Sequence, residues 1–130
     1  MINKNQLNEL TSEDAATLLM ETYPITADNY SEAFIVMNYR SWEKVDQIRL
    51  ARFYLQKMPF ASSKPYEVFA SFMSLPILIG IVNELLPAKI DDQKLMAYYL
   101  IPVIRKFADS EKNSDIINNF LIELKLKYMR

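Results

Sequence analysis

The sequence predicts an all-α fold, a compact bundle of about seven short antiparallel helices. Glycine occurs once in 130 residues, at Gly80, although an average usage of about 7% gives roughly nine in a chain of this length. β-Hairpins depend on glycine for positive φ, and the chain also has no Asn-Gly or Asp-Gly pair. Hydrophobic residues make up 51% of the chain and recur at the three- and four-residue steps typical of helices. We expect one domain, residues 1–130.

The first elements follow from capping signals and prolines. Residues 1–10 are polar with a few leucines and are expected to form a frayed tail or a short first turn. A hydroxyl at Thr11 or Ser12 caps the next helix, because it accepts a hydrogen bond from a free N–H of the first turn. This helix ends before Pro24, since proline restricts the residue that precedes it. A second helix is expected over residues 28–39.

The third helix, residues 42–58, has the clearest periodicity in the chain. Ser41 is the expected cap, and Pro59 ends the helix. Its apolar side is expected to face the core. The positions that recur at helical spacing are Val45, Ile48, Leu55 and Met58.

Prolines also divide the remaining chain. Helices are expected over residues 65–74 and 76–86, with Pro76 as a break between them or a kink in one longer helix; we favour two helices. Gly80 costs about 1 kcal/mol inside a helix, so we expect a neighbouring backbone to approach it closely. A helix over 92–108, capped by Asp91 and kinked or broken at Pro102, precedes a final helix that starts near residue 114.

The charge is unevenly distributed along the chain. Residues 1–46 carry three basic and eight acidic side chains, a net charge of −5, and residues 47–130 carry 12 basic and eight acidic ones, a net charge of +4. An acidic third of this kind attracts a basic partner. Tyr30, Tyr39 and Trp42 fall within this third. They serve either as core residues or as anchors for a docked partner, since aromatic side chains are enriched at interfaces.

The composition excludes most catalytic chemistry. The chain has no histidine and no cysteine, so it lacks the usual general base, thiolate nucleophiles and the commonest zinc ligands. The adjacent carboxylates Glu13–Asp14 and Asp91–Asp92 point about 100° apart on a helix and are interpreted as first-turn residues. We therefore expect no enzyme activity, no cofactor and no metal. A third class of function, an enzyme or ligand-binding protein that uses only carboxylates, Tyr, Ser and Lys, stays open.

Nucleic acid and membranes are also poor candidates as partners. The chain lacks the strongly positive balance that phosphate binding needs. A helix-turn-helix over 42–58 and 65–74 would place few hydrogen-bond donors against base edges. The longest uncharged stretch, residues 68–83, is shorter than a membrane span. The polar start carries no secretion signal, so a cytoplasmic location is expected.

Residues 41–66, SWEKVDQIRLARFYLQKMPFASSKPY, and the overall character of the chain resemble a helical immunity protein of bacterial contact-dependent growth inhibition systems. The resemblance implies a non-catalytic protein that forms a heterodimer with its cognate toxin domain and covers the active site. Many such toxins are basic nucleases. The alternative is a helical adaptor or regulatory subunit with an unrelated protein partner.

On the inhibitor hypothesis, the interface is acidic and lies on the first three helices, with aromatic anchors among the carboxylates. A basic toxin domain would be steered to such a surface by its charge. The residues predicted to bind the partner are Glu13, Asp14, Glu21, Asp28, Tyr30, Glu32, Tyr39, Trp42, Glu43 and Asp46.

Overall fold

The computed structural model describes residues 1–107 and 110–128, and within them it contains eight α-helices and no β-strand. The all-α prediction is therefore confirmed. The 3-10 turns Met37–Tyr39 and Leu55–Lys57 extend α3 and α4. The helices are α1 (Lys4–Asn8), α2 (Ser12–Thr22), α3 (Glu32–Val36), α4 (Lys44–Tyr54), α5 (Lys64–Phe72), α6 (Leu75–Glu84), α7 (Ile90–Arg105) and α8 (Glu111–Tyr128).

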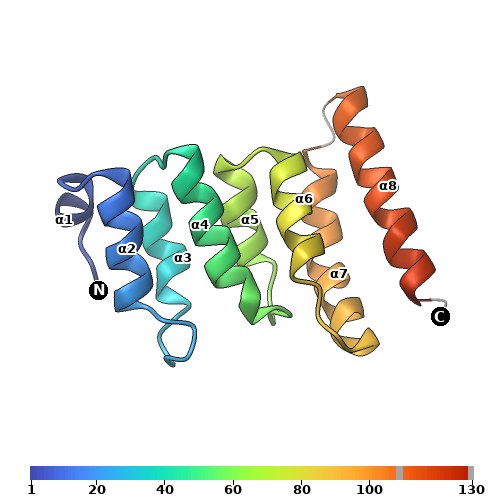
Figure 1. Ribbon diagram of the computed structural model, residues 1–130, viewed down its shortest axis with the longest axis horizontal. Coiled ribbons are helices and arrows are strands. Elements are labelled where there is room, and N and C mark those ends of the chain that lie inside the picture. The colour runs from blue at the N-terminus through green and yellow to red at the C-terminus, as the bar shows by residue number, and fades with distance from the viewer. Residues whose placement is uncertain (108–109, 129–130) are drawn as a thin grey trace.

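From α2 onward the helices form two layers, which follow one another along the long axis of the molecule (Figure 1). One layer contains α2, α4, α6 and α8, and the other contains α3, α5 and α7, because contacts join each helix to the one two places along the chain. Successive helices run in opposite directions, as predicted from the short loops. The short helix α1 lies beside α2 at one end (Figure 1).

Of the two alternatives for residues 1–10, a frayed tail and a short first turn, the structure has the second, as the helix α1. Asn3 caps α1, since its side-chain oxygen accepts a 2.7 Å hydrogen bond from the Gln6 amide. Leu7 and Ile2 are buried, and the Ile2 amide donates to the Tyr23 hydroxyl at 3.0 Å. Two apolar side chains and one buried hydrogen bond therefore fix this segment against the second helix.

Two helices begin later than the sequence predicted. Residues 24–31 form successive turns, in which the Ala27 amide donates to the Pro24 carbonyl and the Tyr30 amide donates to the Ala27 carbonyl, so α3 begins only at Glu32. The helix expected over 42–58 begins at Lys44, and Glu43 rather than Ser41 is its N-cap residue.

The prolines act at the helix boundaries much as expected. Helices α5 and α6 are separate, and Pro76 lies in the first turn of α6, where its missing N–H costs no hydrogen bond. Pro102 lies inside α7, which continues to Arg105. The predicted break at Pro102 is therefore wrong, and the kink stays a prediction. Asp91 and Asp92 lie in the first turn of α7, whose N-cap residue is Lys89.

The prediction that a backbone approaches Gly80 closely is wrong. The residue is exposed on α6, and a β-carbon built on it would meet no atom within 4 Å. Its φ is not positive. Neither packing nor backbone conformation therefore requires glycine at this position.

An aromatic cluster centred on Phe34 joins the layers. Its ring makes edge contacts with Tyr54 at 5.6 Å, Phe60 at 5.8 Å and Phe69 at 6.1 Å between centroids. Burial raises the pKa of the Tyr54 phenol above its ordinary value, which keeps the hydroxyl protonated as a donor at neutral pH.

Among the described residues, no helix is both long and apolar enough to cross a membrane.

Candidate protein-binding surface

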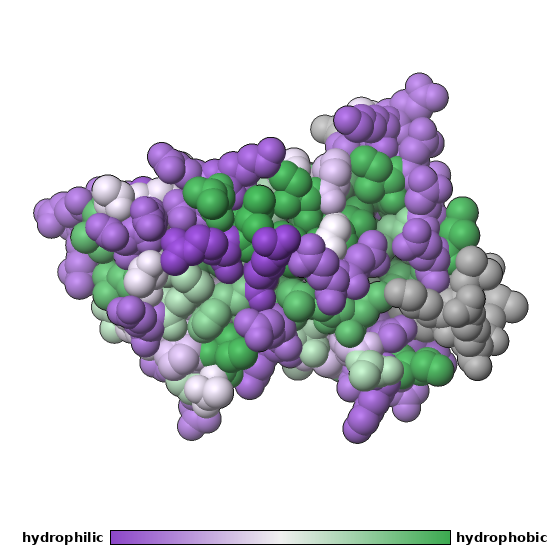
Figure 2. Space-filling view, viewed as in Figure 1, coloured by the Kyte–Doolittle hydropathy of each residue, from purple (hydrophilic) through white to green (hydrophobic). Residues whose placement is uncertain are grey.

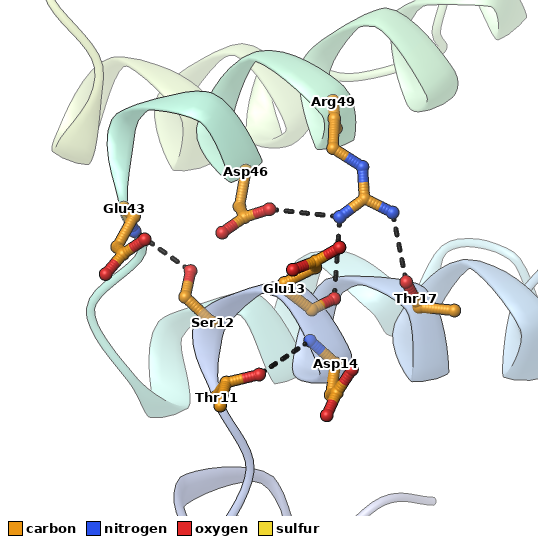
Figure 3. Close-up of polar contacts among 8 residues, drawn as sticks. All are labelled: Thr11, Ser12, Glu13, Asp14, Thr17, Glu43, Asp46 and Arg49. Atoms are coloured by element: carbon orange, nitrogen blue, oxygen red, sulfur yellow. Dashed lines mark hydrogen bonds and ion pairs between the residues drawn. The ribbon is translucent and has the colours of Figure 1, made fainter.

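The starts of α2 and α4 lie side by side and are joined by hydrogen bonds (Figure 3). The buried Ser12 hydroxyl accepts a 3.0 Å hydrogen bond from the Glu43 amide. Arg49 of α4 donates to the Thr17 hydroxyl at 3.0 Å and to the Glu13 carbonyl at 3.4 Å. These contacts fix the first turns of the two helices relative to each other.

Two of the predicted partner-binding residues, Trp42 and Asp46, are buried. Trp42 is 5% exposed, its indole N–H donates to the Met37 carbonyl at 3.0 Å, and the Arg40 guanidinium lies 5.1 Å from the ring centroid. Asp46 is 1% exposed and accepts a 3.0 Å hydrogen bond from Arg49. Both side chains hold the structure together and present almost no surface to a partner.

Arg40 attaches α1 to the segment before α4. Its Nη1 atom donates to the carbonyls of Leu7 and Leu10, at 2.9 and 2.8 Å. These carbonyls lie at the end of α1, where backbone oxygens have no partner within the helix. The guanidinium is therefore engaged within the molecule, and its charge lies against a helix end and the Trp42 ring.

Five exposed carboxylates surround two shallow hollows beside α2. The hollow between α1 and α2, of about 430 Å³, is lined by Glu9, Asp14 and Glu21 together with Leu18. The hollow between α2 and α4, of about 360 Å³, is lined by Glu13 and Glu43 together with Val45, Asp46 and Arg49. We call this set the acidic surface, and its members are Glu9, Glu13, Asp14, Glu21 and Glu43.

The acidic surface is not neutralised by neighbouring cations. None of its five carboxylates forms an ion pair with any residue the structure describes. The nearby cations Arg40 and Arg49 are bonded to backbone carbonyls and to Asp46. Hydrophilic side chains cover part of this end of the molecule, with apolar ones among them, and hydrophilic side chains also cover much of the opposite end (Figure 2). Within the described ranges, no three acidic residues are arranged to hold a metal ion.

Helix capping accounts for part of this arrangement. The Thr11 hydroxyl accepts a 3.1 Å hydrogen bond from the Asp14 amide, as predicted for a cap. Glu13 and Asp14 occupy the first turn, where the helix dipole stabilises each carboxylate by roughly 0.3–1 kcal/mol. The helix N-terminus therefore offsets part of the repulsion between these charges.

The remaining predicted residues lie away from these hollows. Asp28 is exposed in the turns that follow α2, at the opposite end of that helix from Glu13 (Figure 1). Tyr30 is half-buried, with the Lys57 ammonium 5.0 Å from its ring centroid. Glu32 is half-buried in the first turn of α3, and the half-buried Tyr39 hydroxyl donates to the Met1 sulfur at 3.8 Å.

Two of the residues at these hollows, Glu9 and Val45, were not predicted from the sequence. Glu9 belongs to the segment expected to form a frayed tail or a short first turn, and Val45 was assigned to the core. Val45 is 61% exposed, because the buried side of α4 runs through Asp46, Leu50 and Tyr54 instead. The buried side of α4 was hard to predict because it includes Asp46, and a carboxylate is rare at a buried position unless it is paired.

No family model, curated protein or solved structure matches this chain. The interpretation of the acidic surface therefore rests on its own geometry and charge.

Proposed function

We propose that this protein is an immunity protein of a bacterial contact-dependent growth inhibition system. In this proposal it binds a cognate toxin domain in the cytoplasm, forms a heterodimer with it and neutralises it by covering its active site. The toxin is a basic domain, of which a nuclease is the best example. The protein itself performs no catalysis and needs neither cofactor nor metal.

The observation that supports this function best is the set of five carboxylates without ion-pair partners around two hollows. A nuclease must carry a basic site to bind phosphates. Carboxylates facing such a site complement its charge and accelerate association. The described residues that line the hollow between α1 and α2 include no cation, so a partner's lysine or arginine side chain can enter that hollow without first displacing a cation of this chain.

The framework beneath the surface is suited to tight binding. The hydrogen bonds of Ser12, Arg40 and Arg49 fix α1, α2 and the start of α4 together. A surface that is already ordered loses less conformational entropy when a partner docks. Val45, exposed at the rim of the hollow between α2 and α4, is an apolar contact point in place of the buried Trp42.

The test begins with the gene directly upstream, which the proposal predicts to encode a large exported protein with a toxic C-terminal domain. That domain is expressed in a host with and without this chain, and growth is measured. We expect growth to be rescued. In the purified complex, reversing Glu13 and Glu43 together to lysine should slow association about tenfold or more and make it less sensitive to salt.

The matched control reverses two carboxylates at the other end of the molecule. Asp115→Lys with Glu123→Lys changes the net charge by the same amount on exposed positions of α8. We expect its association rate to stay close to that of the unmodified protein. Equal slowing by both double variants would contradict the assigned surface, and failure of the unmodified chain to rescue growth would contradict the immunity function.

A further inference from the structure

A second groove lies between α5 and α7, in the layer that does not contain the acidic surface. It has a volume of about 370 Å³, and Tyr98, Tyr99, Pro102 and Lys106 of α7 line one side. Glu67 of α5 lines the other side. This groove shares no lining residue with the hollows of the acidic surface, so it can bind a partner independently of that surface.

The α7 side of the groove is unusually apolar for an exposed helix. Tyr98 is 72% exposed, more than any other large apolar side chain among the described residues, and Leu95 one turn before it is 40% exposed. The Tyr98 ring packs edge-on against Tyr99, with centroids 5.0 Å apart, which limits its freedom. Exposed aromatic and apolar residues beside a groove are typical of docking sites.

The same face of α7 carries exposed cations both before and after Tyr98. Lys94, Tyr98 and Arg105 share one side, since they are four and seven residues apart, and all three are exposed. Neither Lys94 nor Arg105 forms an ion pair with any residue in the described ranges. Lys106 faces Glu67 at 3.8 Å, and both side chains are about half exposed or more, so water screens this pair and a partner's carboxylate can replace Glu67.

Pro102 adds a backbone feature to the groove. Proline has no N–H, so the hydrogen bond that residue 102 of a helix normally donates to the carbonyl four residues earlier is missing. That carbonyl belongs to Tyr98, at the centre of the exposed face. Since the proline ring lies against the carbonyl four residues earlier, the groove offers a partner apolar rings and the Lys106 ammonium rather than a backbone acceptor.

We propose that the groove between α5 and α7 binds an acidic segment of a partner polypeptide. An aromatic or leucine side chain of the segment packs on Tyr98 and Pro102, and a neighbouring carboxylate pairs with Lys106, which lines the groove. The charges around the groove complement a polypeptide segment with few carboxylates better than they complement nucleic acid. Glu67 and Asp91 lie on the same face and would repel a continuous line of phosphates.

The experiment selects a displayed library of random short peptides on the full-length chain and measures binding of the recovered peptides by fluorescence anisotropy. We expect enriched peptides to carry Asp or Glu beside Trp, Phe or Leu. Recovery of basic peptides alone would overturn the proposal. Competition of an enriched acidic peptide by single-stranded oligothymidylate that itself binds more tightly would also overturn it, in favour of nucleic acid.

Variants then locate the binding site. Tyr98→Ser and Lys106→Glu should each weaken an enriched peptide about tenfold. The matched controls on α8 are Ile122→Ser, which removes a side chain that is 57% exposed, and Lys112→Glu at another exposed position. Both controls should bind the peptide as the unmodified chain does. Equal loss in the α7 variants and their controls, or unchanged binding in both α7 variants, would overturn the assigned groove.

Discussion

The two halves of the molecule share one hydrophobic core but differ in the polar contacts that accompany it. In the first half, α1 to α4, side chains donate hydrogen bonds to backbone carbonyls of distant helices, as Arg40, Arg49 and Tyr54 do. In the second half, α5 to α8, buried aliphatic side chains such as Leu78 and Leu100 fill the space between helices. The first half also carries the acidic surface, whose five carboxylates line the two hollows beside α2.

This comparison shows how a surface of like charges can be kept on a small protein. Neighbouring carboxylates repel one another, and apolar packing alone does not fix the position of a short helix such as α1. Directional hydrogen bonds from buried or half-buried donors fix the backbone directly. In the described part of the second half, packing of buried aliphatic side chains predominates, and packing lacks this directionality.

The largest expected effect comes from removing Arg40. Arg40→Ala should lower the free energy of unfolding by about 2–3 kcal/mol, because two carbonyls lose a charged donor and a cation–π contact is lost. Hydrogen exchange of the amides in residues 2–10 should accelerate with it. The measurement is urea unfolding together with amide exchange.

The control for this prediction is Arg52→Ala, which removes an exposed arginine that pairs with Glu84 at 3.1 Å between α4 and α6. That glutamate raises the pKa of Arg52 through its hydrogen bond and its charge, but solvent screening leaves such a pair little influence on stability. A loss of stability in Arg52→Ala as large as in Arg40→Ala would contradict the proposed difference between the halves.

A smaller effect is expected from two buried tyrosines, one in each half. The Tyr54 hydroxyl donates to the carbonyls of Tyr23 at 2.8 Å and Leu19 at 3.1 Å, whereas the buried Tyr66 hydroxyl has no hydrogen-bond partner in the described structure. Tyr54→Phe should therefore destabilise the protein by about 1–2 kcal/mol. Tyr66→Phe should leave stability unchanged or increase it slightly, since it removes an unsatisfied polar group. Thermal unfolding of both variants makes the comparison, and equal losses would refute it.

The smallest expected effect is a gain. Gly80→Ala should stabilise the second half by up to about 1 kcal/mol, because alanine is the better helix former and the new methyl group meets no atom. The urea midpoint should rise while its slope stays constant. A decrease in the midpoint would mean that the outer side of α6 is covered in solution, for instance by a second copy of the chain.

Most helices were predictable from the sequence, because prolines and capping residues mark their ends locally. Pro24, Pro65 and Pro76 all lie at or next to a helix boundary. The helix at residues 4–8 was predicted only as one of two alternatives, since its stability comes from contacts with Tyr23 and Arg40 that are distant in sequence. The layering was also not predicted, because it depends on which helix faces pair rather than on where helices begin.

The acidic surface was predictable only as a charge count. Glu13, Asp14, Glu21 and Glu43 lie on it, as the sequence predicted for an acidic face. Asp46 does not, because its side chain is buried, where it pairs with Arg49 three residues later. A pair at this spacing on a helix is visible in a sequence, but whether it faces water or the core depends on the neighbouring helix α2.

Trp42 is the single tryptophan of the chain, and its burial between Met37 and Arg40 has a spectroscopic consequence. Tryptophan emission shifts to longer wavelength when the indole becomes hydrated. Emission from this protein therefore reports on the first half alone, whereas far-ultraviolet circular dichroism averages over all the helices. Recording both signals in one denaturant titration distinguishes unfolding of the first half from unfolding of the whole molecule, without any added label.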